Sequence, residues 1–590
     1  MAPFLISVVI LTALALSFYV PAFPWSAIAP GNVHLAGQAL TAAAILIIVS
    51  GRFRKNQARG VTEMKFLKAK RSSTGENAPG GGIYFGGLPL PPDSATSHFM
   101  VVGSTGSGKT LTLRMAMGSV LPALLTQPDQ RAVVFDAKQD AISVLWGILD
   151  DAMRRSSGVD RDFTVEIAKR IFILNPFDQR CYEWNIAADV RSPEVALQFA
   201  TILIPEESGP NRYFSDAARD LLTGVINVLV ERSGEEWRFS DILYAMRSGD
   251  RLRHVLRQTP EGEDLIDLHL EGGNTTRSVI STARSKLAPY EVVAALWRHA
   301  GAAGRRISLH EFLRSNSILV LGTNQAALAP IQAVNRVIFQ RMTELILNQS
   351  ENEERRNWFF LDELRKLGRL DGLDALMTNG RSKGAAVFVG FQDIDGLRAV
   401  YGREIAGEIT SMCASFGVLR VAGASTPQWA SEIFGEHEVV QKTRSQSDTF
   451  GGGGTTYGSY TTGESEHIRE KRLYLPSFFR MVPRPEIGKP LYGYFCSAYL
   501  QSKPYYAEIP PGEVDEMLVE KASSDLDFEP WPDTTSKKLP LWTATDFERL
   551  NLPPMRITVP GVAEPAGAPG QQFIDPFASH RVNPLPEQEA

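Results

Sequence analysis

A glycine-rich octapeptide between an apolar run and a helical pattern constrains this chain more than any other feature. The segment fits G-x-x-x-x-G-K-[ST] and reads Gly103, Ser104, Thr105, Gly106, Ser107, Gly108, Lys109, Thr110. Its glycines let backbone N–H groups face a phosphate, and the start of the next helix adds partial positive charge. In such a P-loop Lys109 reaches the β- and γ-phosphates and Thr110 ligates Mg²⁺. A purely structural glycine turn is the alternative, which the Lys-Thr pair at this spacing argues against.

A second apolar run ends in two carboxylates. Asn357–Leu361 is followed by Asp362 and Glu363, as expected where a buried parallel strand reaches its carboxyl edge. Asp362 would hold Mg²⁺ through water, and Glu363 would activate the attacking water. The alternative is a helix N-terminus enriched in acids. The aromatic strand before the pair and the P-loop upstream favour a Walker B site.

Two further side chains are candidates for the same site. The apolar run Ala385–Phe391 ends at Gln392, and an amide there can sense the γ-phosphate or position water. Arg381 lies in the turn before this run, and in a ring it would act as an arginine finger on a neighbour's nucleotide. An ordinary strand-end glutamine and a solvated turn arginine are the alternatives.

Composition places few limits on function. The 590 residues are enough for two or more domains with substantial cores, and the net charge of −5 is small for that length. Any basic surface for nucleic acid must therefore be local. The cysteines, Cys181, Cys413 and Cys496, are far apart and match neither a zinc pattern nor C-x-x-C, which favours a reducing compartment.

The amino-terminal region has the composition of a membrane anchor. Residues 4–20 and 35–50 are almost wholly apolar and predict two short transmembrane helices joined as a hairpin. The basic flank that follows contains Arg52, Arg54, Lys55, Arg59, Lys65, Lys68, Lys70 and Arg71. The positive-inside rule then places both termini in the cytoplasm. A cleaved signal peptide is the alternative for the first segment, although that segment lacks a basic leading region.

Strand-like segments alternate with helical patterns over most of the chain. The strand candidates are Phe99–Val102, Ala132–Asp136, Ile171–Leu174, Ser317–Leu321, Trp358–Leu361, Ala385–Phe391 and Val418–Val421. This alternation predicts an α/β fold with a mainly parallel sheet and helices on both faces. The alternation breaks between residues 185 and 300, where a helix with an apolar stripe is expected to be capped by Ser215. An all-helical insertion is predicted there.

The domain boundaries follow from these patterns. The membrane hairpin covers residues 1–55, the nucleotide-binding domain covers 56–184 and 301–520, and the all-α domain covers 185–300. A flexible loop is expected at about 445–465, where four consecutive glycines lie among Ser, Thr and Tyr residues. Residues 521–590 are rich in proline and poor in strand patterns, and we expect a disordered tail.

Together these features resemble the type IV secretion coupling proteins, the conjugation ATPases of the TraD/TraG type. Other segments that resemble signatures of this family are Val133-Val134-Phe135-Asp136-Ala137-Lys138, Asn175-Pro176-Phe177-Asp178, Trp184-Asn185, Arg381-Ser382-Lys383-Gly384 and Gly390-Phe391-Gln392. The spacing from Glu363 to Arg381 and on to Gln392 also fits. The resemblance covers about residues 1–500 and leaves out the tail.

The resemblance implies a RecA-like P-loop NTPase domain, an all-α insertion domain, a two-helix membrane anchor and a homohexameric ring with ATP between subunits. It implies that Gly103 to Thr110 bind ATP and that Thr110 and Asp362 hold Mg²⁺. The implied catalytic residues are Lys109, Glu363, Arg381 in trans and Gln392. Asp136 and Lys138 match a family motif to which no chemical step is assigned.

The function implied by the resemblance is that of an ATPase anchored in the bacterial inner membrane. It would recruit a relaxase bound to single-stranded DNA, contact relaxosome proteins, and pass this cargo to inner-membrane components of a type IV secretion channel. An FtsK-like DNA translocase is one alternative, which the two spans and the Pro-rich tail count against. A nucleotide-gated receptor for protein substrates is the other, which Glu363 argues against only in part.

Overall fold

The computed structural model describes residues 82–159, 161–449, 459–500, 503–519, 521–522 and 526–555. The chain divides into two compact units, with boundaries after Tyr182, Ser308 and Trp531. We call the unit that contains the P-loop the sheet unit and the other the helical unit. The predicted membrane hairpin lies outside the described residues. Within the ranges just given, every helix is either too short or too polar to span a bilayer.

The sheet unit is built on a nine-stranded sheet with the order β15-β14-β11-β3-β10-β9-β4-β8-β5. The strands from β11 to β5 run parallel, and β14 and β15 are antiparallel additions at one side. In chain order the strands are β3 (Phe99–Val102), β4 (Gln130–Asp136), β5 (Ile171–Ile173), β8 (Ile318–Gly322), β9 (Arg356–Leu361), β10 (Ala385–Phe391), β11 (Ser415–Val418), β14 (Leu491–Ser497) and β15 (Tyr505–Ile509). The predicted α/β fold is confirmed, and the sheet is mixed, with the parallel strands in the majority as expected.

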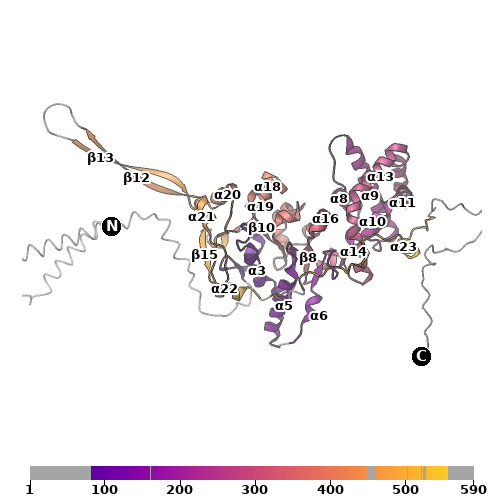
Figure 1. Cartoon of the computed structure of the whole chain (residues 1–590), viewed down its shortest axis with the longest axis horizontal. Coiled ribbons are helices and arrows are strands. Elements are labelled where there is room, and N and C mark those ends of the chain that lie inside the picture. Colours follow the sequence, from indigo (N-terminus) through magenta and orange to yellow (C-terminus); the bar gives the residue numbers. More distant parts are fainter. Residues whose placement is uncertain are drawn as a thin grey trace, which may run out of the picture. The chain divides into compact units, whose positions relative to one another are not determined.

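Helices of the sheet unit connect and flank these strands (Figure 1). They are α3 (Lys109–Val120), α4 (Ala123–Thr126), α5 (Ala141–Ser157), α6 (Thr164–Ala168), α15 (Leu309–Phe312), α16 (Leu328–Leu347), α17 (Leu373–Asn379), α18 (Ile394–Tyr401), α19 (Arg403–Ser411), α20 (Ser425–Ile433), α21 (Pro476–Met481) and α22 (Pro511–Met517). A small hairpin, β1 (Ile83–Phe85) and β2 (Leu88–Leu90), precedes β3.

Aromatic stacking across neighbouring strands stabilises the centre of the sheet. Phe388 of β10 pairs in register with Phe99 of β3 and Phe360 of β9. The Phe388 ring stacks on these two at centroid distances of 4.2 and 4.9 Å. All three side chains are fully buried, as expected of parallel strands covered on both faces. This register brings the carboxyl ends of β3, β9, β10 and β4 to one edge of the sheet.

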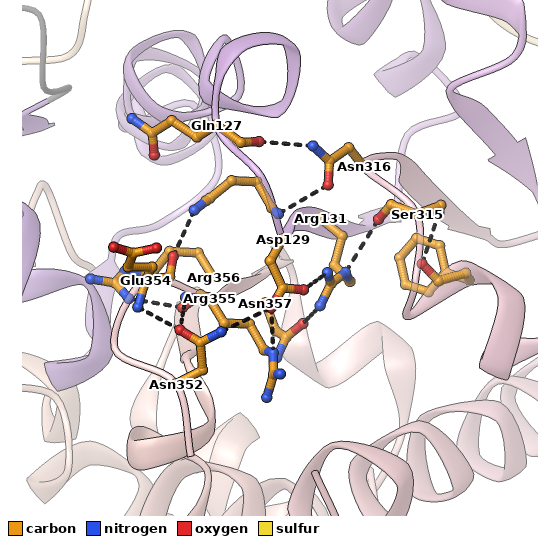
Figure 2. A network of polar contacts seen from close by, with 12 residues as sticks. Gln127, Asp129, Arg131, Ser315, Asn316, Asn352, Glu354, Arg355, Arg356 and Asn357 are labelled. Carbon is orange, nitrogen blue, oxygen red and sulfur yellow. Dashed lines mark hydrogen bonds and ion pairs between the residues drawn. The ribbon is translucent and has the colours of Figure 1, made fainter. Parts of the chain in front are cut away.

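The opposite edge of the sheet carries a buried arginine network (Figure 2). Arg131, at the start of β4, is 1% exposed, and its guanidinium donates to Asn357 Oδ1 at 2.8 Å and to the Ser315 carbonyl at 3.3 Å. It also forms an ion pair with Asp129, which pairs with Arg355 at 2.9 Å. The network therefore ties the turn before β4 to the start of β9.

The helical unit contains the expected all-helical region within bounds of 183–308, against the predicted 185–300. Its helices are α7 (Ile186–Asp189), α8 (Pro193–Leu203), α9 (Arg212–Ser233), α10 (Phe239–Ala245), α11 (Gly249–Leu256), α12 (Pro260–His269), α13 (Gly273–Leu287) and α14 (Glu291–Ala302). The short strands β6 (Glu183–Trp184) and β7 (Arg306–Ile307) pair in parallel where the chain enters and leaves the unit. The expectation that Ser215 caps α9 is wrong, because the helix begins at Arg212 and Ser215 Oγ donates to the Arg212 carbonyl.

The carboxy-terminal segment differs from the disordered tail expected from residue 521, because its described residues up to 555 are ordered. In the helical unit, Trp542 is 6% exposed, and its indole N–H donates to Asp241 Oδ1 at 3.0 Å. The helix α23 (Ala544–Arg549) follows, and Arg549 donates to both Asp241 oxygens at 2.9 and 3.0 Å. The proline content indicated disorder. The buried Trp542 side chain and the ion pair of Arg549 with Asp241 instead pack this segment against the rest of the helical unit, which a disordered segment cannot do.

The predicted flexible loop at 445–465 is also corrected over most of its length. Strands β12 (Glu436–Thr449) and β13 (Ser459–Arg472) pair antiparallel with each other along their whole length and form a separate two-stranded sheet (Figure 1). Ser and Thr are tolerated well in a β-ribbon, so a polar composition did not by itself exclude strands. The consecutive glycines lie outside the described residues.

Candidate nucleotide-binding site

The P-loop connects β3 to α3, and backbone geometry explains its glycines. Gly106 and Gly108 have φ angles of 73° and 98°, in the left-handed region that favours glycine. A Cβ on Gly103 would lie 2.2 Å from Ser107 Oγ, so any other residue there would displace the Ser107 hydroxyl. Lys109 is the first residue of α3. The strand, loop and helix therefore have the arrangement that the sequence motif predicts.

The structure brings the two predicted halves of the site together. Lys109 Nζ donates to Glu363 Oε1 at 2.8 Å and lies 3.6 Å from Asp362 Oδ1. Thr110 Oγ1 donates to Asp362 Oδ2 at 2.8 Å. Both acids follow the end of β9, next to β10 in the sheet. The acidic pair is thus at a strand end facing the P-loop. The acids also precede a short 3-10 helix, Leu364–Leu367, as the alternative of an acidic helix N-terminus expected, but the Glu363 side chain does not cap that helix and contacts Lys109 instead.

Gln392 joins the same cluster. Its amide Nε2 donates to both Glu363 oxygens, at 3.0 and 2.8 Å, and its Oε1 accepts from Thr105 Oγ1 at 3.3 Å. Glu363 itself has a φ of 59°, a conformation that is costly for residues other than glycine and that concentrates at functional sites. The amide therefore links the P-loop to the carboxylate and fixes the orientation of Glu363.

Arg381 does not reach this cluster within one chain. It is exposed and lies in the turn that precedes β10, whereas Gln392 follows the other end of the same strand. The two residues therefore lie toward opposite edges of the sheet. Action on a neighbouring subunit's nucleotide is compatible with this position and stays a prediction.

Two carboxylates near the P-loop have opposite electrostatic environments. Burial by itself would raise the pKa of Glu363. The hydrogen bond and charge of Lys109, together with the hydrogen bond from Gln392, outweigh burial and hold this pKa below the usual value. Glu363 is therefore ionised at neutral pH. Burial raises the pKa of Asp136 to about 6, although it accepts backbone N–H groups of Lys138 and Asp140.

Lys138 is a site residue that reasoning from the sequence did not place. It lies two residues beyond β4, and its Nζ donates to Thr110 Oγ1 at 2.7 Å. The family motif around Asp136 pointed to this segment without indicating the contact. Its position could have been inferred from β4, because the carboxyl end of this strand lies at the same edge of the sheet as the P-loop.

The side chains present fit a magnesium-nucleotide complex. Asp362 Oδ1 is buried and accepts no hydrogen bond from the described residues, and Ser107 Oγ is likewise buried without a partner. A hydroxyl and a carboxylate are ligands that Mg²⁺ accepts alongside phosphate oxygens. Within the described part of the chain, no group of three or more His, Cys, Asp or Glu side chains could hold a metal by itself.

Comparison with known proteins assigns the family. Residues 82–485 match the family model described as the type IV secretion-system coupling protein DNA-binding domain. The chain belongs to this family. Among curated relatives, it is 21% identical over 372 residues to coupling protein TraD of Escherichia coli K12 and 23% identical over 371 residues to protein VirD4 of Agrobacterium fabrum C58.

These alignments cover 62% and 59% of this chain but only 47% and 51% of the relatives, so the chain spans about half the length of the curated relatives it matches.

Solved coupling-protein structures agree on the fold. An unbound form of TrwBdeltaN70 superposes with a TM-score of 0.54 at 22% identity, covering 77% of this chain and 92% of that one. TrwB in complex with ADP and Mg²⁺ gives a TM-score of 0.53 at 21% identity, covering 76% and 91%.

Proposed function

We propose that this chain is a coupling ATPase that uses ATP hydrolysis to pass a relaxase–DNA complex to a type IV secretion channel. The observation that supports this most is the convergence of Lys109, Thr110, Asp362, Glu363 and Gln392 at one sheet edge, in a chain of the coupling-protein family. The TrwB complexes with ADP and Mg²⁺ and with ADPNP support nucleotide and Mg²⁺ as the ligands here.

The proposed roles follow from the contacts. Lys109 would bind the β- and γ-phosphates, and Thr110 and Asp362 would hold Mg²⁺, which supplies charge neutralisation at the phosphates. Because Lys109 now pairs with Glu363, binding of phosphate by Lys109 would release Glu363 to accept a proton from water. Gln392, hydrogen-bonded to both Glu363 oxygens, would keep that carboxylate oriented.

We further propose that the protein acts as an inner-membrane homohexamer. Residues 4–20 and 35–50 would provide the anchor, with both termini cytoplasmic. Contacts to single-stranded DNA would be mainly to phosphates and therefore sensitive to salt and tolerant of sequence. Relaxosome proteins and inner-membrane components of the channel would be the protein partners.

ATP turnover by the purified protein, with and without single-stranded DNA, tests this function. We expect turnover that single-stranded DNA stimulates, because a translocating motor couples hydrolysis to movement along its cargo. The readout is phosphate release over a range of salt concentrations, in which stimulation should weaken as salt rises. Turnover without any response to DNA would favour the nucleotide-gated receptor for protein substrates instead.

Arg381 gives a prediction specific to the ring. Arg381→Ala should leave nucleotide binding unchanged and lower turnover of the assembled ring by about 10³-fold, the usual effect of an arginine finger. Mixing these subunits with Glu363→Gln subunits should restore part of the activity, because some interfaces then combine an intact Glu363 with a neighbour's Arg381. The exposed Arg403 is the matched control, and Arg403→Ala should be neutral. Failure of every mixture to regain turnover would show that Arg381 does not act in trans.

A further inference from the structure

Lys138 contacts the hydroxyl that the proposed site needs for its metal. Its Nζ donates to Thr110 Oγ1 at 2.7 Å, while the Thr110 hydroxyl donates its own proton to Asp362 Oδ2 at 2.8 Å. A lone pair of Thr110 Oγ1 thus faces an ammonium group. That lone pair is the one with which a threonine at this position ligates Mg²⁺. The ammonium and a magnesium ion would therefore compete for the same oxygen.

The loop that carries Lys138 is held from several sides. The Asp136 carboxylate accepts the backbone N–H groups of Lys138 at 3.3 Å and Asp140 at 3.1 Å. Gln139 has a φ of 61°, and its amide donates to the Thr323 carbonyl at 2.8 Å. A glutamine keeps a backbone conformation in the left-handed region only where the surrounding structure holds it there. The backbone is therefore positioned, while the Lys138 side chain is exposed and able to move.

The charges of the cluster balance with Lys138 included. Asp362 and Glu363 are the two carboxylates, and Lys109 supplies one ammonium group beside both of them. Lys138, in contact with Thr110, supplies the second. A divalent ion beside Thr110 would add two positive charges, so repulsion would drive the Lys138 ammonium away.

We propose that Lys138 is a built-in counter-cation that competes with Mg²⁺ at Thr110, and so sets how strongly nucleotide binding depends on the metal. This inference rests on the proposed nucleotide site. Lys138 acts through Thr110, because its ammonium occupies the oxygen that the metal needs, and it takes no part in a chemical step. Without Mg²⁺ its ammonium stands beside the phosphates, and with Mg²⁺ it moves out toward solvent.

The test is the metal dependence of nucleotide affinity in the full-length chain. A fluorescent methylanthraniloyl analogue of ADP is titrated in EDTA and again in saturating Mg²⁺. The quantity compared between proteins is the Kd in EDTA divided by the Kd in Mg²⁺. In Lys138→Met we expect this ratio to rise about tenfold, a usual size for coupling between two ligands. Binding without metal weakens because the cation is lost, and binding with metal gains because a competitor is removed.

Matched variants separate this role from a structural one. Lys138→Arg keeps the charge and should retain a ratio close to that of the wild type. Lys169→Met removes an exposed lysine elsewhere in the sheet unit and should change nothing. If Lys138→Met leaves the ratio unchanged, or lowers it because Lys138 binds phosphate together with Mg²⁺, the proposal is wrong. If the wild-type protein does not bind the analogue under either condition, the proposed nucleotide site itself fails.

Discussion

Lys109→Ala is expected to lower ATP turnover by at least about 100-fold, because it removes a charged donor from the phosphates in a largely buried site. Lys109 is 5% exposed and is the cation closest to both Asp362 and Glu363. Nucleotide affinity should fall with turnover, since the lost contact is made to bound substrate as well as to the transition state. The measurements are phosphate release and equilibrium binding of a fluorescent nucleotide.

Glu363→Gln provides the contrast that makes this result specific. The glutamine retains the size of the side chain but cannot act as a base, so turnover should fall while nucleotide affinity stays near that of the wild type. Lys169→Ala, on an exposed lysine outside the site, should be neutral in both measurements. Wild-type turnover in Lys109→Ala, with folding checked by circular dichroism, would remove the P-loop from the mechanism.

The candidate site was largely predictable because its parts are local motifs at strand ends. Gly103 to Thr110, Asp362 with Glu363, and Gln392 each follow a buried apolar run. Parallel strands place their carboxyl ends at one edge, so predicting the strands correctly is enough to predict the meeting of these residues. The family resemblance, from the same motifs, is confirmed by the match over residues 82–485.

The contacts that were not predictable depend on side chains and on pairing at a distance. The hydrogen bond from Lys138 to Thr110 requires the rotamer of a long exposed side chain, which no periodicity reports. Strands β14 and β15 were missed because their tyrosine-rich segments lie after a polar stretch, far from the motifs. The ordering of Trp542 was missed because proline-rich composition does not reveal a single well-placed aromatic anchor.

The arginine network at the opposite edge of the sheet gives the prediction with the largest expected effect on stability. Asp129→Asn should lower the free energy of unfolding of the sheet unit by roughly 3 kcal/mol, because it leaves a buried guanidinium without its ion-pair partner. Arg131 is only 1% exposed, and its other hydrogen-bond acceptors, Asn357 Oδ1 and the Ser315 carbonyl, are neutral, as an asparagine at position 129 would be (Figure 2). Asparagine is chosen because Asp129 has a φ of 57°, which asparagine tolerates better than alanine does. Urea unfolding followed by tryptophan fluorescence measures the change.

The pKa of Asp129 determines how this loss should vary with pH. Burial would raise that pKa, but the hydrogen bonds and charges of Arg131 and Arg355 outweigh burial and hold it below the ordinary value of 3.8. A carboxylate whose pKa is lower in the folded state stabilises fully above its unfolded pKa and loses that contribution as pH falls through the folded one. The difference between wild type and Asp129→Asn should therefore be constant from about pH 5 to pH 8.

Two further variants distinguish a stranded buried charge from a general loss of surface charge. Asp150→Asn breaks the exposed ion pair of Asp150 with Arg154, and we expect almost no change in stability because water screens such a pair. Adding Arg131→Met to Asp129→Asn should recover part of the lost stability, because the double variant no longer buries an unpaired cation. If instead the two losses simply add, Arg131 does not depend on Asp129. The buried network would then owe its stability to the hydrogen bonds that join β4 to β9.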